Sequence, residues 1–167
     1  MADVMILMGS DSDLPVVEKA YQRLTDLGVA CEMHVASAHR TPAKVHELVA
    51  GTDAKVFICG AGGAAHLAGA VAAATTKPVI GIPLAAGALG GVDALYSTVN
   101  MPPGMPVATV SVGAWGAENA ALLALQILAV GNEALAEKMI EIRNGQRDKV
   151  LSKDDDLQQR LQGTPAQ

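Results

Sequence analysis

The sequence contains few aromatic residues and few charges. Aromatic residues make up 2% of its 167 residues and charged residues 17%, against about 25% charged residues in a typical globular domain. The shortage of charge is concentrated between Val56 and Ala117, where only Lys77 and Asp93 carry one. A single domain of this size does not need so much uncharged surface. We therefore expect a sheet covered on both faces, subunits packed over this region, or both.

Long apolar runs and basic segments are also missing. Gly, Pro, Ser and Thr interrupt the uncharged stretch so often that no run of about 18 apolar residues is left to cross a membrane. The start of the chain lacks the basic region of a secretion signal. A formal net charge of −5 without a basic stripe argues against a nucleic-acid partner. An anionic small molecule remains possible, because glycine-rich turns and one arginine can bind phosphate on an acidic protein.

Cysteine is scarce as well. Cys31 and Cys59 both lie in strand-like segments, and neither belongs to a CxxC motif or a Cys/His cluster. They are typical of buried free thiols in a reducing compartment, so we expect a cytoplasmic protein without a metal site.

Strand patterns alternate with helix patterns along the chain. This alternation predicts an α/β fold with a central parallel sheet and helices on both sides. We expect one domain over residues 1–167, with its core at about 4–130 and a helical extension at 133–167 whose last residues, 162–167, fray. We expect the helix at 117–130 to be buried all round, and Asp154–Asp156 to begin a solvated helix rather than bind a metal. The predicted strands are 4–8, 30–35, 56–59, 78–82 and 107–112.

Polar residues follow the first predicted strand. Ser10, Asp11, Ser12 and Asp13 occupy the turn into the next helix. Ser and Asp are preferred helix caps, but one cap would suffice. Backbone N–H groups at a helix start, joined by two hydroxyls, also suit a phosphate or a ribose. Both interpretations stay open.

A histidine and an arginine follow the second strand. Thr41 and Pro42 mark a helix start, so His39 and Arg40 lie on the loop at the carboxyl end of a strand. In open parallel sheets this edge binds ligands. An imidazole that can titrate near neutral pH therefore lies beside a cation that can fork onto a phosphate. The alternative is a solvated polar turn.

A glycine-rich segment follows the third strand. Gly60, Gly62 and Ala65 match the G-x-G-x-x-A spacing of a dinucleotide site, but no acidic residue lies between Asp53 and Asp93 to bind a ribose. The glycines instead suit a bare backbone against a smaller ligand. His66 is either a residue of the helix start or a wall of the same pocket.

Together these motifs resemble one known family. GSDSD at 9–13, SAHRTP at 37–42 and GAGGAAHL at 60–67, followed by DALYS at 93–97 and Met101-Pro102, are similar to the carboxyaminoimidazole ribonucleotide mutase family of purine biosynthesis, often called PurE. The resemblance covers residues 4–150. It implies a flavodoxin-like three-layer αβα sandwich that assembles as a homo-octamer and needs no cofactor or metal. The chain departs from the family at Ala68, in the Ala- and Gly-rich loop at 84–91, and at Pro103.

The resemblance also implies a substrate and a site. The substrate is an aminoimidazole ribonucleotide whose carboxylate moves from the exocyclic nitrogen to a ring carbon, through trapped carbon dioxide. His39 is expected to act as general acid and base, a role worth roughly 100- to 10,000-fold. Arg40 and Ser12 are expected to bind the phosphate and Asp13 the ribose. The other expected substrate-binding residues are Ser10, Ser37, Ala61, Gly62, Gly63, His66 and Leu67.

Two alternatives remain. A carboxylase of the same superfamily would add free carbon dioxide to the uncarboxylated ribonucleotide; Arg40-Thr41-Pro42 and Ala64-Ala65-His66 favour the mutase. A non-catalytic nucleotide-binding module of flavodoxin type would bind without turnover.

Overall fold

The fold is built on a five-stranded parallel sheet. The computed structural model describes residues 2–162. Its strands lie in the order β2-β1-β3-β4-β5, and every pairing is parallel. This is the order of the flavodoxin-like fold, so the predicted fold class is confirmed. The strands are β1 (Val4–Met8), β2 (Cys31–Val35), β3 (Val56–Gly62), β4 (Val79–Leu84) and β5 (Ala108–Thr109).

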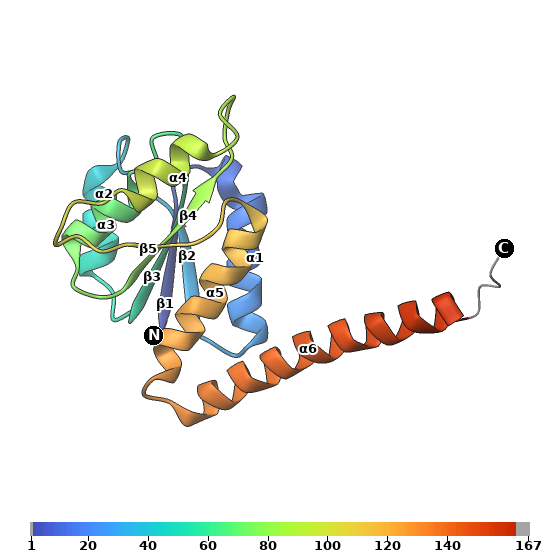
Figure 1. The fold of residues 1–167 in the computed structure, drawn as a ribbon. Helices are drawn as coiled ribbons and strands as arrows, with labels where there is room; N and C mark the ends of the chain where they lie inside the picture. The colour runs from blue at the N-terminus through green and yellow to red at the C-terminus, as the bar shows by residue number, and fades with distance from the viewer. Residues whose placement is uncertain (1, 163–167) are drawn as a thin grey trace. The chain divides into compact units, whose positions relative to one another are not determined.

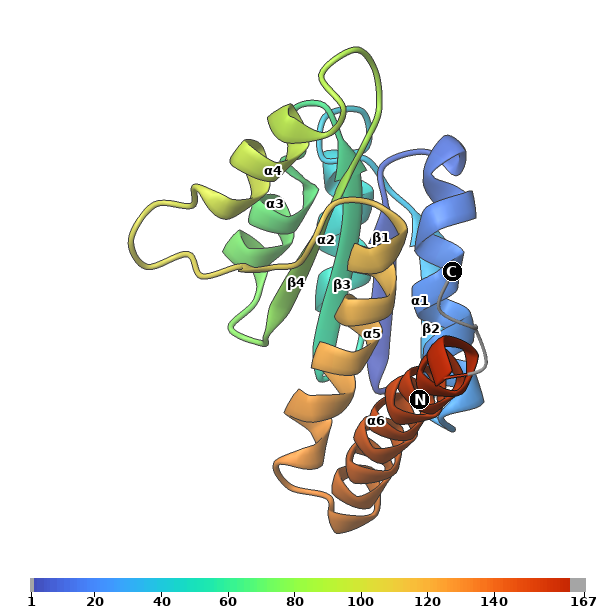
Figure 2. The ribbon, with the colours of Figure 1, turned by 45° about the vertical axis from the view of Figure 1, so that its right-hand side comes forward.

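Helices cover both faces of the sheet (Figures 1 and 2). One face carries α1 (Leu14–Asp26), which follows a short 3-10 helix, η1 (Asp11–Asp13), and α5 (Ala114–Ala129). The other face carries α2 (Pro42–Ala50), α3 (Leu67–Ala74) and α4 (Val92–Val99). These three layers make up the first of two compact units, Met1–Leu128.

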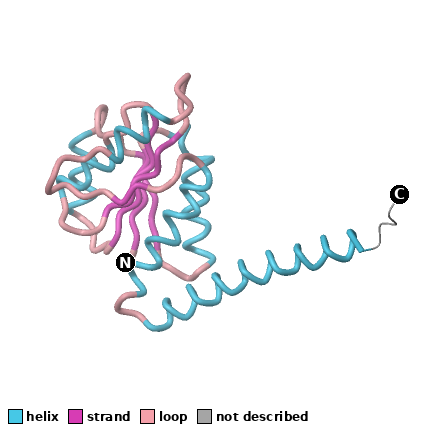
Figure 3. Tube along the Cα trace, in the orientation of Figure 1, coloured by secondary structure: helices cyan, strands magenta, loops and turns pink. Residues whose placement is uncertain are grey.

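The second unit, Ala129–Gln167, contains the long helix α6 (Glu133–Gln162). Figure 3 shows it as one unbroken helix. The prediction that Asp154–Asp156 begin a helix is therefore wrong. They lie inside α6, where the helix continues on both sides of the three aspartates and the Gln158 side-chain amide donates to Asp154 Oδ1 at 3.3 Å. Gln162 is helical too, and the predicted fraying at 163–167 lies outside the described residues.

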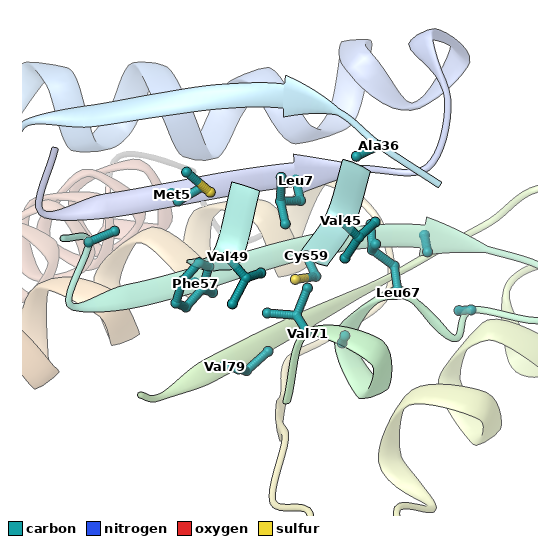
Figure 4. Packing of buried hydrophobic residues seen from close by; sticks show 14 of the residues in the cluster. Met5, Leu7, Ala36, Val45, Val49, Phe57, Cys59, Leu67, Val71 and Val79 are labelled. Atoms are coloured by element: carbon teal, nitrogen blue, oxygen red, sulfur yellow. The ribbon is translucent and has the colours of Figure 1, made fainter. Parts of the chain in front are cut away.

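Alternate strand residues fill two separate cores. Val4 and Ile6 lie on the α1 side, while Met5, Leu7 and Phe57 lie under α2 and α3 (Figure 4). Because β1, β3 and β4 are buried on both faces, their sequences are continuously apolar instead of alternating. The helices above the second core contribute Val45, Val49, Leu67 and Val71.

Four elements differ from their expected bounds by two residues or more. β3 continues to Gly62 and β4 to Leu84 rather than to residues 59 and 82, because their ladder extends to the pair Gly62 and Leu84. β5 covers only Ala108–Thr109 rather than 107–112, since it is an edge strand that pairs at two positions. α5 begins at Ala114 rather than at residue 117, and it is not buried all round, because Glu118, Asn119 and Gln126 are exposed.

The two thiols differ in burial. Cys59 is buried in the sheet, and this burial raises the pKa of its thiol, so the group stays neutral and unreactive. Cys31 is only partly buried. Both are free, as the sequence predicts.

Gly81 tests the packing of β4 against α4. A methyl group there would collide with the Thr98 side chain and lie 3.2 Å from Val107 Cγ1. Gly81→Ala should therefore lower the free energy of unfolding by about 1–3 kcal/mol, as measured by denaturant titration.

Gly145→Ala is the matched control for this substitution. A methyl group at Gly145, inside α6, meets nothing within 4 Å. It should raise the free energy of unfolding by about 0.5–1 kcal/mol, because alanine restricts the unfolded chain. Equal stability of both variants would contradict the packing described here.

Candidate active site

Three loops meet at the carboxyl edge of the sheet. β2, β1 and β3 are parallel neighbours, so the segments that follow them emerge side by side. Between them lies a cavity of about 330 Å³. Every predicted site residue except Gly63 lines it. Gly63 has a left-handed backbone, with φ of 61°, and turns the chain toward α3.

The loop after β1 caps itself. The Ser10 N–H donates to Asp13 Oδ2 at 3.0 Å, and the Ser12 N–H donates to Ser10 Oγ at 3.4 Å, which forms a capping box. The Ser12 hydroxyl donates to Ser10 Oγ at 3.0 Å and is exposed at the cavity. Capping therefore occupies Ser10 and Asp13, while the Ser12 hydroxyl is positioned by Ser10 and can still reach a ligand.

Asp13 is a partly buried carboxylate. Burial raises the pKa of its carboxyl above the ordinary value of 3.8, and the Ser10 N–H and the Arg40 guanidinium offset part of this rise. The ionised carboxylate of Asp13 therefore lowers the stability of the folded protein. Such a cost is tolerated at a site that needs a hydrogen-bond acceptor for a ligand.

The loop after β2 is held by Ser37, a buried serine. Its N–H donates to Thr41 Oγ1 at 2.8 Å, and its hydroxyl accepts the Arg40 N–H at 3.2 Å. Thr41 occupies the predicted N-cap position of α2, but its hydroxyl bonds to Ser37 rather than to the helix. The loop is thus fixed by its own hydrogen bonds before any ligand arrives.

Arg40 ties the first loop to the second. Its Nη2 donates to the Gly9 carbonyl at 2.6 Å, and its Nε donates to Ser37 Oγ at 3.4 Å. A guanidinium has five N–H donors, so the others remain for an anion. Its side chain is therefore preorganised as a cation at the cavity.

His39 and His66 form a pair. His39 Nε2 lies 2.8 Å from His66 Nδ1, and the ring planes are nearly perpendicular, at 78°. One of these facing nitrogens donates and the other accepts, so the contact holds one proton between the rings. The structure resolves the open question about His66: it lies at the start of α3 and also in the cavity wall.

Several lining residues were not predicted. Gly9, Ala38 and Ala64 belong to the three motifs and present little more than backbone. Ala86 comes from the loop after β4, within the Ala- and Gly-rich segment at 84–91 where the chain departs from the family. The Ala86 Cβ would lie 2.6 Å from a Cβ at Gly62, so this loop approaches β3 closely because residue 62 is glycine. Among residues 2–162, no three His, Cys, Asp or Glu side chains gather as metal ligands, and no helix has the length and apolar composition needed to span a membrane.

Comparisons with known proteins give a consistent result. The sequence model of the family described as "AIRC: AIR carboxylase" matches residues 3–149. A protein named N5-carboxyaminoimidazole ribonucleotide mutase from Methanocaldococcus jannaschii is 52% identical over 93% of this chain and 98% of its own. One of the same name from Escherichia coli K12 is 46% identical over 92% of this chain and 93% of its own. The crystal structure of Treponema denticola PurE superposes with a TM-score of 0.84 at 30% identity, over 92% of this chain and 97% of the other.

Asp13 can be tested by two substitutions. Asp13→Asn keeps an oxygen that accepts the Ser10 N–H but carries no charge, so at pH 7 it should be at least as stable as the unmodified chain. Asp13→Ala loses the cap and should lower the free energy of unfolding by about 0.5–2 kcal/mol.

The pH dependence has a definite sign. Because the pKa of Asp13 in the folded protein is above 3.8, the folded state binds more protons there, and its stability falls as pH rises from about 3.8 through the raised pKa. Denaturant titrations should therefore show a larger advantage of Asp13→Asn over the unmodified chain at pH 7 than at pH 4. An advantage that shrinks with pH would contradict this assignment.

Proposed function

Because the chain belongs to the AIR carboxylase family, we propose that it converts N5-carboxyaminoimidazole ribonucleotide into 4-carboxyaminoimidazole ribonucleotide in purine biosynthesis. The observation that carries this proposal is the near full-length similarity to proteins named as that mutase. The polar side chains that line the cavity support it.

The reaction is an isomerisation that needs no net proton or electron. The bond between the carboxylate carbon and the exocyclic nitrogen breaks, and that nitrogen takes up a proton. The released carbon dioxide is attacked by the ring carbon, which forms a carbon–carbon bond. The ring then loses the proton from that carbon and becomes aromatic again. One acid/base group that gives a proton first and accepts one later can serve both steps.

We assign the proton transfers to His39, with His66 as its partner. The short contact between the rings lets a proton lost from one imidazole be replaced from the other. Histidine suits this task because an imidazole can change its protonation near neutral pH. The two rings come from loops after different strands, so their approach depends on the sheet.

The remaining polar groups suit the sugar phosphate. Arg40 is anchored on Gly9 and Ser37 and offers its free N–H groups to the phosphate, beside the Ser12 hydroxyl. We assign Asp13 to accept from ribose hydroxyls, with Ser10 nearby. Ser37, His66, Leu67 and the backbone at Ala61 and Gly62 line the same cavity and are assigned to the ring and its carboxylate; the role of Gly63 stays a prediction.

We further propose that the protein acts as a homo-oligomer, an octamer as the family resemblance implies, in the cytoplasm. Val92, Tyr96 and Val99 form a stripe along α4 and are 52%, 67% and 53% exposed. Large apolar side chains at helical spacing mark a surface that another chain covers. The two free cysteines suit a reducing compartment.

A carboxylase is the second candidate, since the matching family is described as AIR carboxylase. Purified protein should be given the N-carboxylated and the uncarboxylated ribonucleotide separately, at low bicarbonate, while product absorbance is followed. We expect rapid turnover of the N-carboxylated substrate only. Rapid turnover of the uncarboxylated ribonucleotide would select the carboxylase, and binding of both without turnover would select a nucleotide-binding module.

His39→Asn tests the acid/base assignment. The substrate should still bind, but the rate should fall by a factor within the roughly 100- to 10,000-fold range of general acid/base catalysis. His46→Asn is the matched control, because His46 is exposed on α2 and does not line the cavity. It should keep full activity. Retention of more than about a tenth of the rate by His39→Asn would rule out this role.

A further inference from the structure

A second cavity adjoins the candidate active site on the far side of Arg40. It has a volume of about 300 Å³ and shares Gly9, Ser10, Ser37 and Arg40 with the first cavity. The charged side chains that line it are Asp11, Arg40 and Lys44. Arg40 therefore lines both cavities, whereas Lys44 lines only the second, outer one.

Lys44 has an unfavourable position for helix stability. It lies in the first turn of α2, which contains no acidic residue. The positive end of the helix dipole repels a cation there. Among the described residues Lys44 forms no ion pair, and Oδ1 of Asp11 in the same cavity accepts the Ser10 hydroxyl and the Ser12 N–H, both at 3.1 Å. No ion pair within the described part of the chain therefore accounts for this charge.

The charges of the two cavities explain why a second cation is useful. A phosphate monoester carries close to two negative charges at pH 7. Arg40 supplies one positive charge, while Asp11 and Asp13, in the loop after β1, add two negative charges. One guanidinium does not balance this total, and a lysine on the outer side brings the local charge closer to neutral.

We propose that Lys44 is a specificity-determining residue that selects phosphorylated substrates, by binding the phosphate ester from the outer cavity opposite Arg40. This proposal rests on the proposed function for the identity of the ribonucleotide but not for the binding of a phosphate ester. The compact ammonium acts as a point charge, whereas Arg40 fixes the geometry.

Lys44→Gln is the main test. In low salt it should raise KM for the N-carboxylated ribonucleotide about tenfold while kcat changes less than about twofold, as for a charged contact made equally in ground and transition states. Lys44→Arg should restore KM to within about threefold. The increase should shrink toward 1 M salt, because the group is exposed.

Lys19→Gln is the matched control, since it removes the same charge from an exposed site on α1 that lines neither cavity. Its KM should equal that of the unmodified chain. An equal rise in KM for both variants would reduce the effect to net charge and overturn the proposal.

Calorimetry separates this proposal from the catalytic one. Ribose 5-phosphate should bind the unmodified chain, and Lys44→Gln should weaken it about tenfold without changing the affinity for ribose. If this holds in a protein without mutase turnover, the assignment of Lys44 stands and the proposed function fails. If Lys44→Gln keeps mutase turnover with an unchanged KM and an unchanged affinity for ribose 5-phosphate, only the proposed role of Lys44 is overturned.

Lys44→Glu reverses the charge at this position, and its expected effects on stability and on phosphate binding differ. An acidic residue suits the first turn of a helix, so the melting temperature should not fall. Binding of ribose 5-phosphate should nevertheless be lost. A loss of binding that accompanies a lower melting temperature would point to a structural role and overturn the proposal.

Discussion

The parallel pairing of β2, β1 and β3 determines where every group of the candidate site lies. The chain meets the active edge of the sheet only where a strand ends, so serines, an aspartate, an arginine and two histidines from distant segments converge there. Hydrogen bonds between the loops then fix these groups relative to one another. Arg40 reaches the Gly9 carbonyl across the gap between the loops after β2 and β1, and His39 reaches His66 across the gap to the loop after β3. A slip of β2 would displace both contacts, because Arg40 and His39 both follow that strand.

The scarcity of large side chains has a structural cause at this edge. A Cβ at Gly60 would lie 2.5 Å from Val17 Cγ2, and one at Gly62 would lie 2.6 Å from the Ala86 Cβ. Helix α1 and the loop after β4 therefore approach β3 only because these residues are glycine. The same segment exposes its backbone to the cavity. The close packing and the surface for a ligand therefore both follow from the lack of side chains in this segment. This explains why the glycine spacing imitates a dinucleotide motif although no acidic ribose partner follows it.

Much of the architecture could be predicted from the sequence because its signals are local. The strands β1 and β2 lie within one residue of the segments that the apolar runs predict. Contacts between distant residues were harder. Nothing in the neighbourhood of His66 indicates a ring 27 positions away, and β5 is short because pairing with β4, rather than its own propensity, sets its length. Asp154–Asp156 were misread because three aspartates favour a helix start locally, whereas the surrounding residues continue α6.

Under the proposed roles, the two histidines carry out the proton transfers and the two cations bind the phosphate. The two imidazoles are nearly perpendicular and hold one proton between their facing nitrogens. A reaction with no net proton change needs a group that gives a proton in one step and takes one back in a later step. Arg40 is held by hydrogen bonds to Gly9 and Ser37, whereas Lys44 lines the outer cavity with a flexible side chain. Rigid contacts fix the position of a substrate, and flexible exposed charges mainly add attraction. Under the proposed function, a clamp on the phosphate would position the ring of the ribonucleotide at the imidazoles, so that binding of the phosphate would contribute to the geometry of proton transfer.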